Sequence, residues 1–344
     1  MEYSLQDSSF WYFINKDSNP LQTRIEFVFN LVVNKPPTNQ DNLFTFHEFN
    51  GKLNVKKEDK EKKIHEVWDE IKQSYGLLRE WYEDWELYHL IGYLVTVGEK
   101  LQILLTSANG ITKSAFKKSL RTRIKKYVGN DWADLHYGEK EDKRIQHVLL
   151  LFNILSILRA GDRGTRFSFN RYKGEGDINR QWSLEHIHAQ HSEGLNTQKQ
   201  WEAWLNEHKL SLERIDPTNF AALISKIERL NTKEINREQF NGLHNDIIAV
   251  YKKVDEMSDD EMHHISNLAL LDSRSNSALN NSVFEVKRQL IIQREKKAEF
   301  IPLCTRNVFL KYYTGKADNL YFWGKTDRQN YFHEIEELIK PYQS

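Results

Sequence analysis

Cysteine is almost absent from this sequence, and its scarcity excludes several kinds of structure. Among 344 residues there is one cysteine, Cys304. A single thiol excludes a framework of disulfides, and it excludes a zinc site built from four thiolates. Because scarce cysteine is typical of proteins from reducing compartments, we expect this protein in the cytoplasm.

Long apolar runs and an excess of one charge are also missing. No stretch reaches about 18 apolar residues, so we expect no membrane-spanning helix and no membrane partner. The first residues also lack the basic and apolar regions of a signal peptide. Basic and acidic residues both number 49, so nucleic acid could be met only through a local basic patch. The 39% hydrophobic content and nine tryptophans are typical of a folded, soluble protein.

Apolar residues recur at helical spacing through roughly the first 160 residues. The clearest case is residues 57–85, where Ile64, Val67 and Ile71 follow the helical period and charges fill the remaining positions. This pattern predicts a long charged helix, although Gly76 within it is unfavourable in a helix interior. Other helices are expected at residues 5–14, 23–33, 87–97, 101–105 and 144–159.

The composition changes near residues 161–166, a glycine-rich and charged segment. A chain of this length can contain two domains with proper cores. We therefore expect a helical domain at residues 1–164 and a second domain at residues 165–344. Weak alternation over residues 166–172 predicts a strand at the start of the second domain.

Residues 113–126 carry seven basic residues and no acid. Phe116, Leu120 and Ile124 repeat every fourth residue, so the segment is predicted to be an amphipathic basic helix. One interpretation is a surface that follows a phosphate backbone. The other is an ordinary solvated helix face, and the sequence leaves both open.

The second half contains two strand-like stretches separated by a long insertion. The first is residues 180–189, where Glu185 and His186 interrupt an otherwise apolar run that begins at Trp182. The second, residues 263–271, is a candidate return strand. The insertion of about 75 residues between them has helical segments around residues 198–208, 220–230 and 233–254. Three further helices are expected, at 282–297 after a capping box at Ser282–Glu285, at 306–313 and at 328–339.

The residue types in these two stretches and in the residues that follow the second, up to Asn276, suit phosphodiester hydrolysis. A histidine can deprotonate water near neutral pH, and a divalent cation offsets the charge that develops on the phosphate. His186 supplies the imidazole, whereas Glu185 and Asn276 supply oxygen ligands of the kind that Mg²⁺ prefers. Asn267 is placed to hold the imidazole in one orientation. Because neighbours on a strand point to opposite faces, we expect a break between His186 and Ile187.

The same residues carry a resemblance to a known family. Glu185-His186-Ile187, residues 267–271 and Asn276 resemble the HNH (ββα-metal) nuclease signature. More narrowly, residues 165–344 resemble the HNH domain of GmrSD-type modification-dependent (type IV) restriction endonucleases. Residues that match this family's pattern include Arg166-Phe167-Ser168-Phe169, Trp182, Asn280-Asn281, Phe284, Lys287-Arg288, Ile301-Pro302, Thr305 and Phe309.

The resemblance implies a mainly α fold, with a helical amino-terminal domain and an α-rich HNH domain around a small ββα-metal core. Glu185 and Asn276 would hold Mg²⁺, Mn²⁺ or another divalent cation, His186 would be the general base, and Asn267 would brace the loop and orient His186. The partner would be DNA, including modified phage DNA, cut to 3′-hydroxyl and 5′-phosphate ends. The family's amino-terminal nucleotide-handling module is not found in this sequence, and one cysteine cannot form the zinc staple of many HNH proteins.

Weaker candidates and alternative functions accompany this interpretation. Four residues are weaker candidates for contacts with DNA: Arg166, His264, Lys287 and Arg288. The alternative from another class is a helical DNA-binding or regulatory module with an inactive HNH fold. A nuclease directed at RNA is a second alternative.

Overall fold

The computed structural model describes residues 1–15, 23–36, 38–138, 140–162, 164–175, 180–188, 195–229, 235–252, 257–273, 282–314 and 320–343. The chain divides into two compact units. The first contains residues 1–127 and 157–180, and the second contains residues 128–156 and 181–344. The chain therefore passes between the units three times, whereas the sequence predicts a single passage at residues 164–165.

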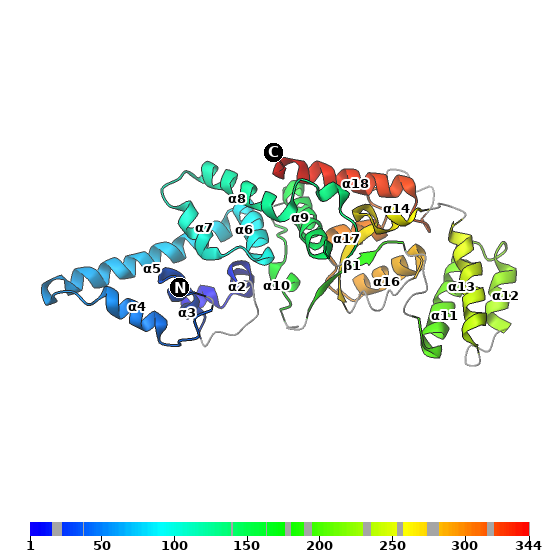
Figure 1. The fold of residues 1–344 in the computed structure, drawn as a ribbon, viewed down its shortest axis with the longest axis horizontal. Coiled ribbons are helices and arrows are strands. Elements are labelled where there is room, and N and C mark those ends of the chain that lie inside the picture. The colour runs from blue at the N-terminus through cyan, green and yellow to red at the C-terminus, as the bar shows by residue number, and fades with distance from the viewer. Residues whose placement is uncertain are drawn as a thin grey trace. The chain divides into compact units, whose positions relative to one another are not determined.

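Helices make up most of the regular structure (Figure 1). Among the described residues, the strands are β1 (Trp182–His186) and β2 (Leu268–Asp272). The prediction of a mainly α fold is confirmed. Within the part of the chain that the structure describes, no helix combines the length and the apolar character needed to cross a membrane.

The first unit has α6 (Trp85–Val97) at its centre, and every residue from Leu87 to Val95 is buried. The helix α5 (Lys60–Glu83) precedes it without interruption at Gly76, so the long charged helix predicted from the sequence is confirmed. The unit also contains α1 (Glu2–Leu5), α2 (Ser8–Ile14), α3 (Arg24–Val32), α4 (Phe44–Lys52), η1 (Lys57–Asp59), α7 (Leu101–Ala108) and α8 (Lys113–Val128), which ends at the boundary.

The prediction of a strand at residues 166–172 is wrong, because residues Phe169–Tyr172 form the short helix α10. The alternation in the sequence arises from aromatic side chains that pack into the first unit. Phe169 is fully buried against α6, where Gly92 leaves room for its ring. A Cβ atom at Gly92 would lie 2.2 Å from Cε2 of Phe169, so the close approach depends on the glycine.

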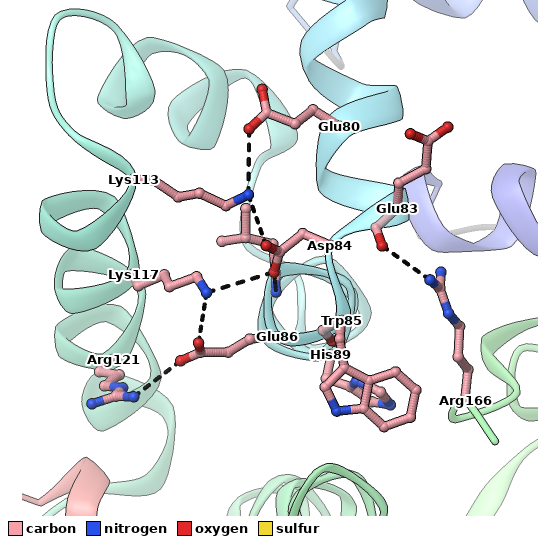
Figure 2. A network of polar contacts seen from close by, with 11 residues as sticks. Glu80, Glu83, Asp84, Trp85, Glu86, His89, Lys113, Lys117, Arg121 and Arg166 are labelled. Atoms are coloured by element: carbon pink, nitrogen blue, oxygen red, sulfur yellow. Dashed lines mark hydrogen bonds and ion pairs between the residues drawn. The ribbon is translucent and has the colours of Figure 1, made fainter. Parts of the chain in front are cut away.

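The basic segment predicted at residues 113–126 forms α8, and several of its cations face acidic side chains where α5 meets α6 (Figure 2). Lys113 Nζ lies 2.7 Å from Oδ2 of Asp84. Lys117 Nζ lies 2.7 Å from Oε2 of Glu86. Part of the basic charge of α8 is therefore neutralised inside the first unit.

The second unit is built around the antiparallel pair of β1 and β2. In this pair Glu185 lies opposite Ala269, and His186 lies opposite Leu268. The helical elements around it are η2 (Trp132–Asp134), α9 (Asp142–Ala160), which continues into the first unit, α14 (Asp259–His263), η3 (Ile265–Asn267), α16 (Phe284–Lys296), α17 (Leu303–Phe309), α18 (Lys325–Ile339) and η4 (Lys340–Tyr342).

The three helical segments predicted in the insertion are seen among its described residues as α11 (Gln198–Ile215), α12 (Ala221–Arg229) and α13 (Arg237–Lys252). They share an apolar core that includes Trp201, Trp204 and Phe240 and extends to Val283 before α16. The backbone N–H of Val283 donates to Nε2 of His208 at 3.3 Å. The insertion is thus connected by packing and by a hydrogen bond to the helix that follows β2.

Two predicted boundaries in this unit are wrong. The return strand begins at Leu268, and the preceding residues form α14 and η3 instead of a strand. The capping box predicted at residues 282–285 is not formed, because Val283 is the N-cap of α16 and makes no side-chain cap. Helix α16 nevertheless spans most of the predicted segment.

Candidate functional site at the end of strand β1

Glu185 and His186 are the last two residues of β1. Glu185 is 5% exposed, whereas His186 is half-buried, as expected for neighbours on opposite faces of a strand. The strand ends at His186 and residues 187–188 form a bend, so the predicted break between His186 and Ile187 is confirmed. The two residues of the bend, Ile187 and His188, are buried, and the N–H of Ile187 donates to the carbonyl oxygen of Asn267 at 2.8 Å.

The Glu185 carboxylate is paired with a lysine from α16. Lys287, whose side chain is 1% exposed, forms an ion pair with Oε1 of Glu185. The same ammonium donates a hydrogen bond of 2.6 Å to the carbonyl oxygen of His186. Burial raises the pKa of the Glu185 carboxyl, and the charge and hydrogen bond of Lys287 oppose this effect only in part. Lys287 therefore joins the acid and the backbone of the histidine into one buried cluster.

The imidazole of His186 contacts a second histidine. Nε2 of His186 lies 3.2 Å from Nδ1 of His263, the last residue of α14. The ring of Tyr137 packs on His186 with a centroid separation of 4.8 Å, and on His263 with a separation of 6.1 Å. The backbone N–H of Tyr137 also donates to the carbonyl oxygen of His263 at 2.7 Å. These contacts come from segments far apart in the sequence and converge on one side of His186.

Asn267 is fully buried and connects the bend after β1 to the turn before β2. Its Oδ1 accepts from the backbone N–H of His188 at 3.1 Å, and its Nδ2 donates to the carbonyl oxygen of the same residue at 3.0 Å. Nδ2 also donates to the carbonyl oxygen of Met262 at 2.9 Å. The structure therefore places Asn267 as a brace of the backbone two residues beyond His186 and beside the helix that carries His263.

The remaining candidates from the sequence occupy varied environments. Asn276, the second proposed metal ligand, lies outside the described residues. Nδ1 of His264 lies 2.8 Å from the hydroxyl of Ser266, and Nε2 lies 2.8 Å from the carbonyl oxygen of Ala133, so both nitrogens are engaged within the protein. Arg288 lies 3.5 Å from Oε2 of Glu285.

Arg166 belongs to the first unit, whereas Glu185 belongs to the second. The guanidinium of Arg166 donates to the carbonyl oxygens of Tyr82 and Glu83 at the end of α5, and Figure 2 shows the second of these bonds. It also lies over the ring of Tyr88, 4.9 Å from the centroid. Arg166 thus closes the end of a helix in its own unit.

Three contributions to this site are missed by sequence reasoning. Tyr137 falls in the segment assigned to the amino-terminal domain, and no local pattern marks it. His263 is predicted only as the first residue of the return strand, and Lys287 only as a candidate for phosphate contact. Their contacts with Glu185 and His186 span 49 to 102 positions of the sequence, from which no spacing rule could derive them.

The Glu185 carboxylate is suited to hold a hard cation, although it already has a partner. Lys287 forms an ion pair with Oε1, and no hydrogen bond or ion pair from another described residue to Oε2 is seen. Mg²⁺ accepts one or two protein carboxylates and keeps water molecules, so a single free carboxylate oxygen is sufficient for a first contact. The described residues contain no group of three His, Cys, Asp or Glu side chains that could hold a metal. Among the described residues Glu185 supplies one oxygen of the kind that Mg²⁺ prefers, and the second proposed ligand, Asn276, lies outside them.

Comparison of the chain with protein-family models, with curated proteins and with solved structures gave no match.

Proposed function

We propose that this protein is a metal-dependent endonuclease of the HNH type that hydrolyses DNA phosphodiester bonds. The proposal rests on one observation above all. Glu185 and His186 are neighbours at the end of β1, Lys287 contacts both the carboxylate of Glu185 and the carbonyl oxygen of His186, and Asn267 hydrogen-bonds to the backbone of the bend that follows. The resemblance of residues 165–344 to the HNH domain of GmrSD-type restriction endonucleases supports it and suggests modified or phage DNA as the substrate.

In this proposal each residue of the site has its own role. His186 accepts a proton from the attacking water, the role that an imidazole commonly has in general base catalysis. Asn267 keeps the bend after β1 in place and thereby keeps the histidine at the end of the strand. Glu185 and Asn276 would hold the cation. When bound, a divalent cation supplies positive charge next to the phosphate and stabilises the leaving oxygen.

The first prediction concerns cleavage itself. The purified protein should convert supercoiled plasmid to nicked or linear DNA with Mg²⁺ or Mn²⁺, and EDTA should abolish the reaction. His186→Ala should lower the rate by ~10²–10⁴-fold, the usual contribution of a general base. His333→Ala is the matched control, because His333 is an exposed histidine on α18, and its rate should equal that of the parent. Equal rates for His186→Ala and the parent would refute the assignment.

A second candidate function is a DNA-binding or regulatory module with an inactive HNH fold. The observation that favours it is the ion pair of Glu185 with Lys287, because a carboxylate already neutralised by an ammonium binds a metal less strongly. A protein that binds DNA in a gel-shift assay but does not cut it with any divalent cation would support this alternative. Parallel assays with DNA and RNA of the same sequence decide which nucleic acid is the substrate.

A further inference from the structure

We infer that His263 is a positioning residue that sets the tautomer and the orientation of His186. This inference rests on the proposed function, in which His186 is the general base. The contact that carries it is the one between Nε2 of His186 and Nδ1 of His263 at 3.2 Å. The two ring centroids lie 5.2 Å apart, and the ring planes make an angle of 77°. The imidazoles therefore meet edge to face and are not stacked.

His263 is held firmly enough to act as a reference for its neighbour. It ends α14, whose first turn is closed by a complete capping box between Ser258 and Glu261. The His263 carbonyl accepts from the N–H of Tyr137, and the preceding residue, Met262, is buried and accepts from Asn267. The same asparagine also hydrogen-bonds to the backbone of His188, in the bend after β1. Asn267 therefore holds the backbone near both His186 and His263.

The chemistry of a neutral imidazole then allows one arrangement. Such a ring has one N–H and one nitrogen with a lone pair. If Nε2 of His186 accepted a hydrogen bond from His263, the only lone pair of the neutral ring would be used and none would remain for water. A base at His186 therefore requires that Nε2–H donates to Nδ1 of His263, which leaves the lone pair on Nδ1 of His186. Partners of this kind fix the tautomer of catalytic and metal-bound histidines in general.

The proposal distinguishes His263 from a phosphate-binding residue and from a residue that only fills space. A phosphate contact would change the affinity for DNA, and a packing role would change stability. A positioning role changes the rate of the chemical step and leaves binding nearly unaffected. Asparagine is the informative replacement, because its side-chain amide lies near the position of Nδ1 and can accept the hydrogen bond. Leucine has a similar volume and cannot.

The test compares His263→Leu, His263→Asn and the control His333→Leu with the parent protein in plasmid cleavage. We expect His263→Leu to lower kcat by ~10–100-fold, the usual cost of losing an orienting partner, with KM changed less than about twofold. His263→Asn should recover most of the lost kcat, and His333→Leu should match the parent. An unchanged kcat in His263→Leu, a rise in KM instead of a fall in kcat, or no recovery in His263→Asn would overturn the inference.

A second measurement separates this inference from the proposed function. Long-range ¹H–¹⁵N spectra report which nitrogen of each histidine carries the proton, and the His186→Ala variant identifies the signal of His186. In the DNA-free parent we expect the Nε2–H form at His186, and in His263→Leu a mixture of both forms. If cleavage is absent but this change is seen, the proposed function fails and the positioning contact stands. A His186 signal that is the same in both proteins, or an Nδ1–H form in the parent, overturns the inference whatever the activity.

Discussion

The side chains of Lys287 and Glu185 are both removed from water, with exposures of 1% and 7%. Taking two opposite charges out of water costs several kcal/mol for each ion, and their attraction repays this only when the geometry is good. The hydrogen bond from Lys287 to the carbonyl oxygen of His186 improves that geometry. The ion pair therefore adds little net stability. Removing only one of its two charged side chains would, however, leave an uncompensated charge in the core.

Removal of one partner should consequently cost more than removal of both. Lys287→Met should lower the free energy of unfolding by about 3–5 kcal/mol, the usual cost of breaking a buried pair. The double variant Lys287→Met/Glu185→Gln should recover more than half of this loss, because no buried charge remains. Urea denaturation at neutral pH measures both values.

Lys296→Met is the matched control for this experiment, because Lys296 is an exposed lysine on the same helix. Its effect should stay within about 0.5 kcal/mol. A Lys287→Met variant as stable as this control would show that the ion pair is absent in solution.

At the residue scale, sequence reasoning located the end of β1 but not the surroundings of its side chains. Glu185 and His186 stand out because two polar residues interrupt an apolar strand, and that pattern is local. The ion pair with Lys287 is not local, since it joins positions about 100 residues apart through the packing of α16 on the sheet. The surface role predicted for Lys287 followed from its charge alone, whereas its burial depends on the fold.

At the scale of elements, the helical period predicted long helices well and short segments poorly. The helix α5 has enough turns for the period to be clear, so Gly76 could not disrupt the prediction. Residues 166–172 are too few to distinguish a strand from the single turn of α10. The capping box at residues 282–285 failed for another reason, because α16 begins one residue later than predicted, with Val283 as its N-cap, so Glu285 is the second and not the third residue of the helix.

Asp84, at the junction of α5 and α6, both caps a helix and forms ion pairs with a neighbouring helix. Its Oδ1 accepts from the backbone N–H of Leu87 at 2.9 Å and so caps α6, and its carboxylate faces Lys113 and Lys117 (Figure 2). Burial alone would raise the pKa of Asp84. The cap and the two lysines outweigh it and hold the pKa below its ordinary value.

Asp84→Ala should therefore destabilise the first unit by about 1–2 kcal/mol, the range measured for lost N-caps. Asp84→Asn should cost less, because an asparagine retains the cap and loses only the partly exposed ion pairs. Asp69→Asn provides the control, since Asp69 pairs with Lys72 on the exposed face of α5. Equal losses for Asp84→Ala and Asp84→Asn would mean that the charge, and not the cap, stabilises this corner.

At the scale of the whole molecule, each unit contains a buried histidine that is held by the same two kinds of hydrogen bond. In the first unit, Nε2 of His89 accepts from the N–H of Phe167 at 3.2 Å, and its Nδ1 lies 2.7 Å from the carbonyl oxygen of Trp85. In the second, Nε2 of His208 accepts from Val283, and its Nδ1 lies 2.7 Å from the carbonyl oxygen four residues before it. Each ring is thus a neutral Nδ1–H form that joins two remote segments.

These contacts also show why the predicted boundary at residues 164–165 differs from the division of the structure. Phe167 follows that boundary in the sequence, yet its backbone is bonded to α6 of the first unit. Composition marks a change in local character at residues 161–166. Composition does not show which unit's core the next aromatic residues join. That depends on contacts between residues about 80 positions apart in the sequence.

Both buried histidines should make the protein sensitive to mild acid. Burial lowers the pKa of His89 to about 4 and that of His208 to about 3. In the unfolded chain both titrate near their ordinary value of 6.5. Between these limits the unfolded state binds more protons, so stability is fully present above about pH 6.5 and falls as the pH decreases. At pH 5.5 each histidine should cost its unit about 1.4 kcal/mol, since one pKa unit corresponds to that energy.

Urea denaturation at pH 7.5 and pH 5.5 tests this expectation for each unit. His89→Gln and His208→Gln cannot titrate, so both should be less stable than the parent at pH 7.5. Each should also lose about 1.4 kcal/mol less between the two pH values than the parent does. Exposed carboxylates and histidines titrate equally in variant and parent and cancel in this difference. If the pH dependence were the same in all three proteins, the two histidines would have to be protonated in the fold, and the hydrogen bonds from Phe167 and Val283 to their Nε2 atoms could not exist.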